Sequence, residues 1–324
     1  GRVLTGEQES LNGGPPVEAL FVQNTNPMSV APETTRVREG FARDDLFVCV
    51  HEQFMTDTAA MADIVLPATM FLEHTDMYPG GGHTLLMLSK PIIEPYADCR
   101  TNHQVLSTLA KRLGGTHRGF DMSEWDIIDE TLRLSRMPSA DEVWAKDKWI
   151  DCALPFEDAH FLNGFGTPDK RFHFAPDWSR VGANNSDMPS LPDHFDNIDK
   201  ADEERPFRLV AAPAQSYLNS TFTETPTSQK TEKRPSAKLH PDDLSTLGLK
   251  DGDRILMGNR RAEITLHAEA FDGLQPGVVV VESVWPNTAF KNELGINALT
   301  SADPGPPNGG GVFHDTAVWI KAAS

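Results

Sequence analysis

The stretch from Phe47 to Ala68 (FVCVHEQFMTDTAAMADIVLPA) constrains the fold of this chain more than any other part of its sequence. Val48 to Val50 are an apolar run that is too short for a helix and predicts a buried strand. A polar loop follows, then small helix-forming residues, and then a second strand, Asp63 to Leu66, which a proline ends. Because ligands of α/β sheets bind outside the carboxyl ends of strands, the polar loop predicts a ligand site. The alternative is an ordinary strand-to-helix loop with Thr56 or Asp57 as helix cap.

A similar strand and loop precede this stretch. Val17 to Val22 predict a strand that runs into Gln23-Asn24-Thr25-Asn26-Pro27, where amides and a proline favour a turn rich in donors and acceptors. Residues 34–43 predict a helix, with Gly40 near its end. A strand, a helix and a second strand in this order predict a parallel βαβ unit.

Several weaker signals follow Pro67. The triplet Gly80-Gly81-Gly82 would permit close approach of a ligand, although a flexible turn is the more common role of such a triplet. Thr101 or Asn102 is expected to cap a helix with one apolar face. Ser123 is expected to cap the next helix, and Arg171 to Phe174 predict a strand.

The character of the chain changes after residue 174. Residues 175–206 are rich in Pro, Asp and Asn and predict a linker between two domains. Beyond them, short apolar runs alternate with turn signals such as Asp251-Gly252-Asp253 and Pro276-Gly277. Short strands in such a row predict a small β-barrel. The expected strands are Phe207–Ala212, Arg254–Met257, Ala262–His267, Val278–Ser283 and Ala317–Ile320.

Charge and hydropathy narrow the possible partners. The 324 residues carry 29 Lys and Arg against 47 Asp and Glu, a net charge of −18. Such acidity argues against nucleic acid or an anionic membrane surface as the partner. No run approaches the roughly 18 apolar residues of a membrane helix. No signal peptide is visible, although the chain does not begin with Met.

The three cysteines, Cys49, Cys99 and Cys152, are far apart and form no CxxC motif. No zinc or iron–sulfur site is therefore expected in this chain. Cys49 lies in an apolar run and is expected to be a buried thiol. This cysteine usage favours a reducing, cytoplasmic compartment and leaves a periplasmic location open.

Two segments resemble a known family. The sequence HEQFMTDTAAMADIVLPATMFLEH, residues 51–74, resembles the core motif of the molybdopterin-dependent oxidoreductases of the dimethyl-sulfoxide-reductase superfamily, which includes formate dehydrogenases and nitrate reductases. The sequence HPDDLSTLGLKDGDRILMGNRRAEITL, residues 240–266, is similar to the C-terminal molybdopterin-dinucleotide-binding domain of that family. The Asn-Pro loop resembles the usual companion of the core motif. The resemblance covers nearly the whole chain.

The resemblance implies a fold class and a domain organisation. Residues 1–174 would form part of an α/β domain with a parallel, Rossmann-like sheet. Residues 175–206 would be the linker, and residues 207–324 a six-stranded double-psi β-barrel. The chain would then be the C-terminal half of a larger enzyme.

The resemblance also implies a cofactor and a reaction. The cofactor would be molybdenum, with tungsten as the alternative metal, held by two molybdopterin guanine dinucleotides. The reaction would be a two-electron oxidation or reduction of a small substrate such as formate or nitrate, with the chemistry carried by the cofactor. One alternative is a non-catalytic cofactor-binding module. Another, which sets the resemblance aside, is an acidic protein that binds some other nucleotide.

Two parts of the family pattern are not matched. The cysteine-ligated four-iron cluster has no counterpart, and the three cysteines do not fall where the family places its molybdenum ligand. No catalytic residue and no metal ligand are therefore expected in this chain. Both would belong to the N-terminal half of the same enzyme, which is the implied partner together with a small-molecule substrate and an electron-transfer subunit.

An acidic protein must hold phosphates with backbone N–H groups, helix N-termini and hydroxyls instead of bulk charge. Glu52 could accept from guanine N–H groups or could be a solvated loop acid. Asn102 could read guanine or could only cap its helix. The cofactor-binding candidates of the first half are Asn24, Thr25, Asn26, Glu52, Gln53, Phe54, Thr56, Thr58 and Asn102.

The barrel half has its own candidates. The loop after the first barrel strand holds Gln, Ser, Tyr, Asn, Ser and Thr within seven residues, which resembles a family loop that wraps a pterin and its phosphates. Trp285 could equally be a core residue, and His314 a structural histidine. The candidates are Gln215, Tyr217, Asn219, Ser220, Thr221, Ser283, Trp285, Asn297 and His314.

Overall fold

The computed structural model describes the chain except residues 181–184, 186–187, 192, 194–198, 306–308 and 324. Its contacts divide the chain into two compact units. The first unit comprises residues 1–50, 55–64 and 174–324, and the second comprises residues 51–54 and 65–173. The division falls within the stretch that begins at Phe47, so this stretch contributes residues to both units. The domain boundaries expected from the sequence at residues 174 and 206 stay a prediction.

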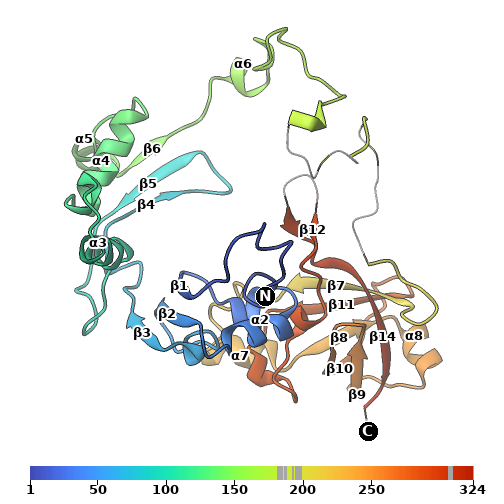
Figure 1. Cartoon of the computed structure of the whole chain (residues 1–324). Helices are drawn as coiled ribbons and strands as arrows, with labels where there is room; N and C mark the ends of the chain where they lie inside the picture. The colour runs from blue at the N-terminus through green and yellow to red at the C-terminus, as the bar shows by residue number, and fades with distance from the viewer. Residues whose placement is uncertain (181–184, 186–187, 192, 194–198, 306–308, 324) are drawn as a thin grey trace. The chain divides into compact units, whose positions relative to one another are not determined.

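A closed six-stranded β-barrel forms most of the first unit (Figure 1). Its strand order is β10-β8-β11-β7-β14-β9, with β11 parallel to β7 and β10 parallel to β8. The predicted six-stranded barrel is thereby confirmed, and its double-psi topology stays a prediction. The strands are β7 (Phe207–Pro213), β8 (Ser236–Leu239), β9 (Arg254–Gly258), β10 (Glu263–Ala270), β11 (Val278–Ser283) and β14 (His314–Ala322).

The alternation of side chains explains most of the barrel. In β10, Ile264, Leu266 and Ala268 are buried and the residues between them are not, as the period of two in a strand requires. β8 was not predicted because its four residues contain only two apolar side chains, Ala237 and Leu239, which are too few to show a period. Both of these are fully buried. The barrel core also includes side chains from the loops after β11: Trp285, Phe290, Ile296 and Leu299.

A three-stranded sheet with the order β1-β2-β3 precedes the barrel in the chain. The amide of Asp63 donates to Val48 O at 2.9 Å, and the amide of Ala68 donates to Glu52 O at 3.1 Å. Residue numbers therefore rise together along β2 and β3, which confirms the predicted parallel sheet; the Rossmann-like arrangement stays a prediction. The elements are β1 (Ala19–Gln23), α1 (Pro27–Val30), α2 (Thr34–Phe41), β2 (Phe47–Glu52), the 3-10 helix η1 (Ala59–Met61) and β3 (Ile64–Pro67).

The second unit contains an antiparallel sheet with the order β4-β5-β6, beside which α4 and α5 lie (Figure 1). A small apolar core joins them, with Leu88 of β5 packed among Ile128, Leu132, Ala140 and Val143. The elements are β4 (Asp76–Pro79), β5 (Leu85–Ser89), α3 (Asn102–Arg112), α4 (Glu124–Leu134), α5 (Ala140–Lys146) and β6 (Trp149–Asp151).

One predicted element is wrong. Arg171 to Phe174 do not form a strand, and the amide of Arg171 instead donates to the Asp169 carboxylate at 3.1 Å in a turn. Alternating aromatic side chains favour a strand, but a strand also needs a neighbour for its backbone groups. Residues 171–174 are not assigned to any strand, and Phe172 and Phe174 are exposed. The predicted helix near residue 102 is confirmed as α3, with Leu106, Leu109 and Leu113 exposed.

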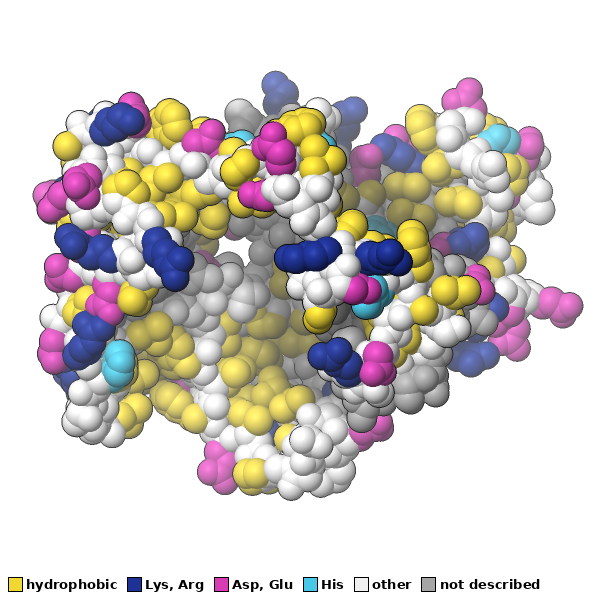
Figure 2. All heavy atoms as spheres, turned by 90° about the horizontal axis from the view of Figure 1, so that it is seen from above, with side chains coloured by type: hydrophobic (Ala, Val, Ile, Leu, Met, Phe, Trp, Pro, Cys, Tyr) yellow, Lys and Arg dark blue, Asp and Glu magenta, His cyan; other side chains and the backbone are white. Residues whose placement is uncertain are grey.

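On the face that Figure 2 presents, Lys and Arg side chains lie among Asp and Glu, so that face carries no extended basic patch. None of the helices in the described residues combines the length and the apolar character that crossing a bilayer requires. The remaining elements are η2 (Arg118–Phe120), α6 (Phe156–Ala159), η3 (Trp178–Arg180), α7 (Pro226–Glu232), α8 (Pro241–Leu247), η5 (Asn287–Ala289), η6 (Ile296–Ala298), β12 (Pro304–Gly305) and β13 (Gly310–Gly311).

Candidate functional site

The loop after β1 contains two kinds of predicted binding residue. Asn24 and Thr25 are exposed, and Asn24 has a left-handed backbone with φ of 58°, which asparagine adopts more readily than most residues. Asn26 is buried, and its side chain is used within the protein. Asn26 Oδ1 accepts from the Thr58 hydroxyl at 2.6 Å, and Asn26 Nδ2 donates to Ser29 Oγ at 3.2 Å. Asn26 and Thr58 therefore support the loop, whereas Asn24 and Thr25 are accessible to a ligand.

Two asparagines from the barrel half end the short helix α1. A helix of four residues leaves its last carbonyls without partners inside the helix. Asn287 Nδ2 donates to Met28 O at 2.7 Å, and Asn297 Nδ2 donates to Ser29 O at 2.9 Å. Both asparagines are buried, with 2 % and 5 % of their surface exposed. These donors connect the loop after β1 to loops that lie more than 250 residues later in the chain.

Asp57 joins the same cluster from the loop after β2. Asp57 Oδ2 accepts from the Ser29 hydroxyl at 3.2 Å and from the backbone amide of Asn287 at 3.3 Å. Three loops that are far apart in the sequence therefore meet through buried and half-buried polar groups. We call this cluster the loop clamp, and its members are Asn26, Ser29, Asp57, Thr58, Asn287 and Asn297.

The sequence identified only part of the loop clamp. Asn26, Thr58 and Asn297 were expected to bind the cofactor; the structure shows their side chains bonded within the protein, and their contact with the cofactor stays a prediction. Ser29 was not singled out, because nothing in its local sequence shows that its segment meets the loop that contains Asn287. The best available signal was the position of Asn287 directly after a proline in a loop that follows a buried strand.

The loops after β7 and β11 meet beside the barrel. Because β7 and β11 are parallel, both loops leave the barrel at the same edge. The rings of Tyr217 and Trp285 are T-shaped, with centroids 5.2 Å apart and planes at 88°. Trp285 Nε1 donates to Glu282 O at 3.1 Å, so the indole is part of the barrel core, as one of the two sequence interpretations expected.

The Tyr217 hydroxyl is a free polar group in this packed region. The side chain is buried, and Tyr217 Oη has no hydrogen-bond partner among the described residues. Burial and the nearby Glu232 carboxylate raise the pKa of the phenol, which therefore stays protonated as a donor. A buried donor without a partner costs about 1–3 kcal/mol. A ligand atom that accepts from this hydroxyl would remove that cost, so the site fits a ligand with polar groups.

The tip of the same loop presents predicted residues at the surface. The amide of Leu218 donates to Thr221 O at 3.1 Å, and the amide of Thr221 donates to Leu218 O at 2.9 Å. Asn219 lies within this tight turn with φ of 51°. Asn219 and Thr221 are exposed and Ser220 is half-buried, so the turn holds three polar side chains close to the surface.

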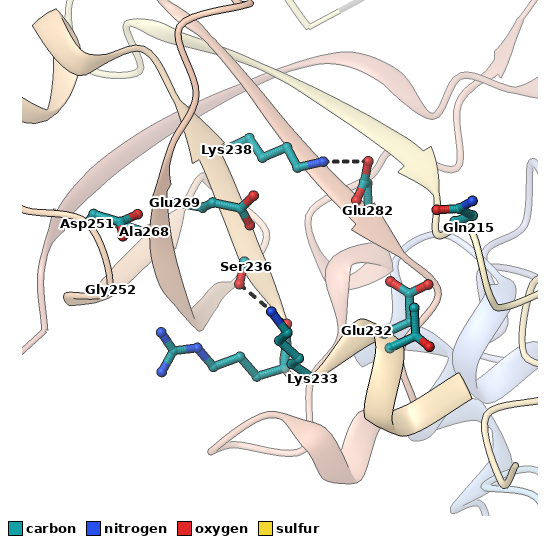
Figure 3. A pocket seen from close by; sticks show the side chains of 12 residues that line it. Gln215, Glu232, Lys233, Ser236, Lys238, Asp251, Gly252, Ala268, Glu269 and Glu282 are labelled. Carbon is teal, nitrogen blue, oxygen red and sulfur yellow. Dashed lines mark hydrogen bonds and ion pairs between the residues drawn. The ribbon is translucent and has the colours of Figure 1, made fainter. Parts of the chain in front are cut away.

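A pocket of about 420 Å³ lies beside this loop (Figure 3). Gln215 is one of its lining residues, and the backbone amide of Ser216 next to it donates to Glu232 Oε1 at 2.7 Å. Lys238 Nζ of β8 pairs with Glu282 Oε1 of the neighbouring strand β11 at 2.7 Å, within the lining of the pocket (Figure 3). The charged lining residues are of both signs, so the pocket suits a hydrogen-bonding ligand better than a phosphate held by charge alone. They are Glu232, Lys233, Arg234, Lys238, Asp251, Glu269 and Glu282.

The second unit holds the residues that end β2 and follow it. Glu52 Oε1 accepts from the amide of Gln53 at 2.7 Å, and Gln53 Nε2 donates to Thr69 O at 2.9 Å. His51 is buried, with Nε2 at 3.1 Å from Arg100 O. Phe54 is exposed. Gln53 is therefore tied to the chain after β3, while the second carboxylate oxygen of Glu52 has no hydrogen-bond partner among the described residues.

Asn102 lies at a second pocket, of about 260 Å³, in the same unit. The cap of α3 is Thr101 and not Asn102: Thr101 Oγ1 accepts from the amide of Gln104 at 3.1 Å, and Gln104 Oε1 accepts from the amide of Thr101 at 3.2 Å. The sequence left the choice between Thr101 and Asn102 open, and this capping box decides it. Asn102 is exposed at the first helical position, so a ligand-binding role for it stays a prediction.

The Thr101→Ala variant is expected to weaken α3 by about 1 kcal/mol, because it removes the N-cap acceptor. Asn102→Ala, one position later, is the matched control and should change the stability by less than about 0.5 kcal/mol. Hydrogen exchange of the α3 amides in the intact chain measures both effects. Equal acceleration of exchange in the two variants would show that the cap is assigned to the wrong residue.

Three predicted residues remain. Thr56 Oγ1 accepts from the amide of Ala59 at 3.1 Å, but the residue at the N-cap of η1 is Thr58 and not Thr56 or Asp57, and no side chain caps this short helix. Ser283 ends β11, and its side chain lies outside the described part of the chain. His314 begins β14 and is exposed. The binding roles of these three stay predictions.

Two of the three thiols have raised pKa values, which disfavours them as metal ligands. Burial raises the pKa of Cys49, and burial together with the Glu73 and Asp98 charges raises the pKa of Cys99, so both are protonated near neutral pH. Among the described residues, no group of three or more His, Cys, Asp or Glu side chains has the geometry to hold a metal ion.

The parallel sheet and the barrel are thus joined through their polar loops by the loop clamp. Two family models identify the family. The molybdopterin oxidoreductase model matches residues 7–112, and the molydopterin dinucleotide binding domain model matches residues 207–317. The chain belongs to the molybdopterin oxidoreductases, the family that the sequence motifs resemble.

Individual relatives agree with this assignment. The chain is 33% identical to "Probable oxidoreductase YoaE" of Bacillus subtilis over 99% of this chain and 46% of that protein. It is 26% identical to "Trimethylamine-N-oxide reductase" of Haemophilus influenzae over 86% of this chain and 37% of that protein. Acetylene hydratase from Pelobacter acetylenicus has a similar fold, with a TM-score of 0.78 at 20% identity over 99% of this chain and 46% of that chain. The chain thus spans less than half the length of these proteins.

These findings confirm the family and the cofactor predicted from the sequence, a molybdopterin dinucleotide with molybdenum. The residues present fit such a group. The unpartnered Tyr217 hydroxyl and the accessible side chains at Asn24, Thr25 and the 218–221 turn offer donors and acceptors at the strand ends where a dinucleotide would lie.

Proposed function

We propose that this chain is the dinucleotide-binding part of a molybdenum oxidoreductase that exchanges two electrons with a small substrate. The observation that carries the proposal is the loop clamp. It joins a loop within residues 7–112 to loops within residues 207–317, the two segments that match the family models. A cofactor with two dinucleotide arms needs binding loops from both segments to be held at fixed positions.

The proposed role of the chain is to bind and orient the cofactor. Molybdopterin-bound molybdenum supplies the two-electron chemistry when it is present. With a net charge of −18, the chain would hold pyrophosphates through hydroxyls, amides and backbone N–H groups of the loops after β1 and β7. The free carboxylate oxygen of Glu52 and the side chain of Asn102 are proposed to accept from and donate to guanine. The Tyr217 hydroxyl is proposed to donate to the cofactor.

The proposed substrate is a small N-oxide or sulfoxide. This choice rests on the name of the Haemophilus influenzae relative, a trimethylamine-N-oxide reductase, and on the family resemblance. Formate and nitrate, expected from the sequence, are the competing substrates. The iron–sulfur cluster, the molybdenum ligand and an electron-transfer subunit are proposed to lie in polypeptide that this chain does not include, and the proposed compartment is the cytoplasm.

The protein purified from cells that express it at its own locus should contain molybdenum and pterin in the same fraction. Elemental analysis and pterin fluorescence measure these contents. Reduced viologen should be oxidised by trimethylamine N-oxide or dimethyl sulfoxide faster than by nitrate, and formate should not reduce oxidised viologen. Molybdenum and pterin without turnover of any of the four substrates would favour the non-catalytic module. A preparation with neither molybdenum nor pterin would contradict the proposal.

A further inference from the structure

The pocket of about 420 Å³ beside the loop after β7 lies mostly outside the predicted cofactor site. Its lining comes from α7, β8, β10 and the end of β11, together with loops next to them (Figure 3). Gln215 is a predicted cofactor residue, whereas the other residues that the structure places in the lining are not. A volume of this size is typical of small-molecule sites. The pocket is therefore a candidate site for a second ligand.

One wall of the pocket is a strained turn. Lys233, which follows α7, has φ of 66° and ψ of −72°, and the amide of Arg234 donates to Glu232 O at 2.8 Å. This is the γ-turn with positive φ, which is rare and unfavourable for a residue that has a Cβ. Pro235 does not explain it, because a proline restricts the residue directly before it, which is Arg234.

Strained backbone of this kind is concentrated at ligand sites. In this pocket the strained turn places two consecutive cations, Lys233 and Arg234, in the lining. A regular helix end would not need this conformation, because helices commonly end in the left-handed helical region at glycine or asparagine. The position of the two cations is therefore the feature of the turn that a ligand would use.

Charged side chains of both signs line the pocket, and several of them are not paired with one another. Lys238 Nζ lies 2.7 Å from Glu282 Oε1, so these two neutralise each other. No salt bridge in the described part of the chain involves Lys233, Arg234 or Glu269. The two cations precede β8, whereas Glu269 lies beside Lys238 in the register of β8 and β10. Unpaired positive and unpaired negative charge are therefore held at different places around the pocket.

We infer that this pocket binds a small zwitterion, a molecule whose carboxylate and ammonium groups are separated by a short carbon chain. Lys233 and Arg234 bind the carboxylate, for which the guanidinium offers two parallel N–H donors. Glu269 accepts from the ammonium group. The carboxylates of Glu232 and Asp251, also in the lining, already accept from backbone amides at 2.7 and 2.8 Å. A ligand with a single charge would leave one side of the pocket unpaired, so the site selects for molecules that carry both charges.

Calorimetric titration of the intact protein with a matched series of compounds tests the inference. γ-Aminobutyrate and ε-aminocaproate carry both charges, whereas butyrate, caproate, butylamine and hexylamine have the same chain lengths and one charge. We expect one of the two zwitterions to bind about tenfold more tightly than its carboxylate and amine analogues, because each analogue loses one charged contact. No binding of either zwitterion, or equal affinity for a single-charge analogue, would overturn the inference.

Variants of the two sides of the pocket provide the second measurement. Arg234→Gln and Glu269→Gln should each weaken zwitterion binding about tenfold, because each removes a charged partner. Arg254→Gln and Glu263→Gln are the matched controls, since these two residues lie on β9 and β10 outside the lining of the pocket, and they should leave binding unchanged. Thermal unfolding verifies that the variants fold, and alanine replaces glutamine in any variant that does not. Equal losses in the controls would contradict the site.

Lys233→Gly separates a ligand site from a helix end. Glycine adopts positive φ without strain, so the unfolding temperature of the ligand-free protein should stay the same or rise. Zwitterion binding should weaken about threefold, as for the loss of one exposed ion pair. Unchanged zwitterion binding in this variant would show that the turn only ends α7, and would contradict the inference.

The inference does not rest on the proposed function, because zwitterion binding is measured without turnover. The titration is carried out on protein with and without bound molybdopterin, and binding is expected in both forms. Binding that disappears when molybdopterin is present would assign the pocket to the cofactor and overturn a separate zwitterion site.

Discussion

Asn297→Ala should destabilise the first unit by about 1–3 kcal/mol, because Ser29 O would remain buried without a donor. Asn287→Ala should cost at least as much, since Asn287 Nδ2 donates to Met28 O and Asn287 Oδ1 accepts from the amide of Gly295 at 2.9 Å. Asn297→Asp keeps the size of the side chain but replaces the donor with an acceptor. It should therefore be more destabilising than Asn297→Ala.

The predicted loss should appear first in the loop after β1. Hydrogen exchange of the amides of residues 28–31 should accelerate in all three variants, and the retention of molybdopterin through gel filtration should fall with it. Asn292→Ala is the control, because Asn292 is an exposed asparagine of the same segment. Unchanged exchange at residues 28–31, or an equal change in Asn292→Ala, would show that the loop clamp does not hold this loop.

The two asparagines should also be coupled. Both cap the same short helix, and adjacent contacts of this kind are not additive. Once one donor is lost and the end of α1 loosens, the second donor has less structure to stabilise. The double variant should therefore be less destabilised than the sum of the two single variants, and strict additivity would indicate two independent contacts.

Local sequence patterns were sufficient to predict the secondary-structure elements that have a clear apolar run or a regular alternation of apolar and polar residues. The apolar run at Val48 to Val50, the alternation at Ile264 to Ala268 and the turn glycines between the barrel strands each report a local backbone preference. Ser236–Leu239 and Trp149–Asp151 were missed because three or four residues carry too little periodicity to identify a strand. Their strand structure depends on the neighbours with which they pair.

The candidate site was predictable only as a set of loops. Polar composition identified the segments after β1, β2, β7 and β11, but composition cannot show which side chains are bonded inside the protein. Asn24 and Asn26 look equivalent in the sequence, yet Asn24 is exposed and Asn26 is bonded to Thr58. The bond between Asn26 and Thr58 joins residues that are 32 positions apart in the sequence. The bond between Asn297 and Ser29 joins residues that are 268 positions apart. Contacts between residues so far apart in the sequence are determined by the tertiary fold.

The Tyr217→Phe variant should separate stability from cofactor binding. Without the cofactor, removing a buried hydroxyl that has no partner should leave the free energy of unfolding unchanged or raise it by up to about 1 kcal/mol. With the cofactor, the same change removes one hydrogen bond worth about 1–1.5 kcal/mol and should weaken cofactor retention roughly tenfold. Thermal unfolding of the cofactor-free protein and pterin content after gel filtration measure the two effects.

Tyr78→Phe is the matched control for this experiment. The Tyr78 hydroxyl is also buried, but it belongs to β4, outside the predicted binding loops. Its removal should leave cofactor retention unchanged. If Tyr217→Phe instead lowers the stability of the cofactor-free protein and leaves retention unchanged, the Tyr217 hydroxyl serves the fold of the loop after β7. The assignment of that loop to the cofactor would then rest on its exposed turn at residues 218–221 alone.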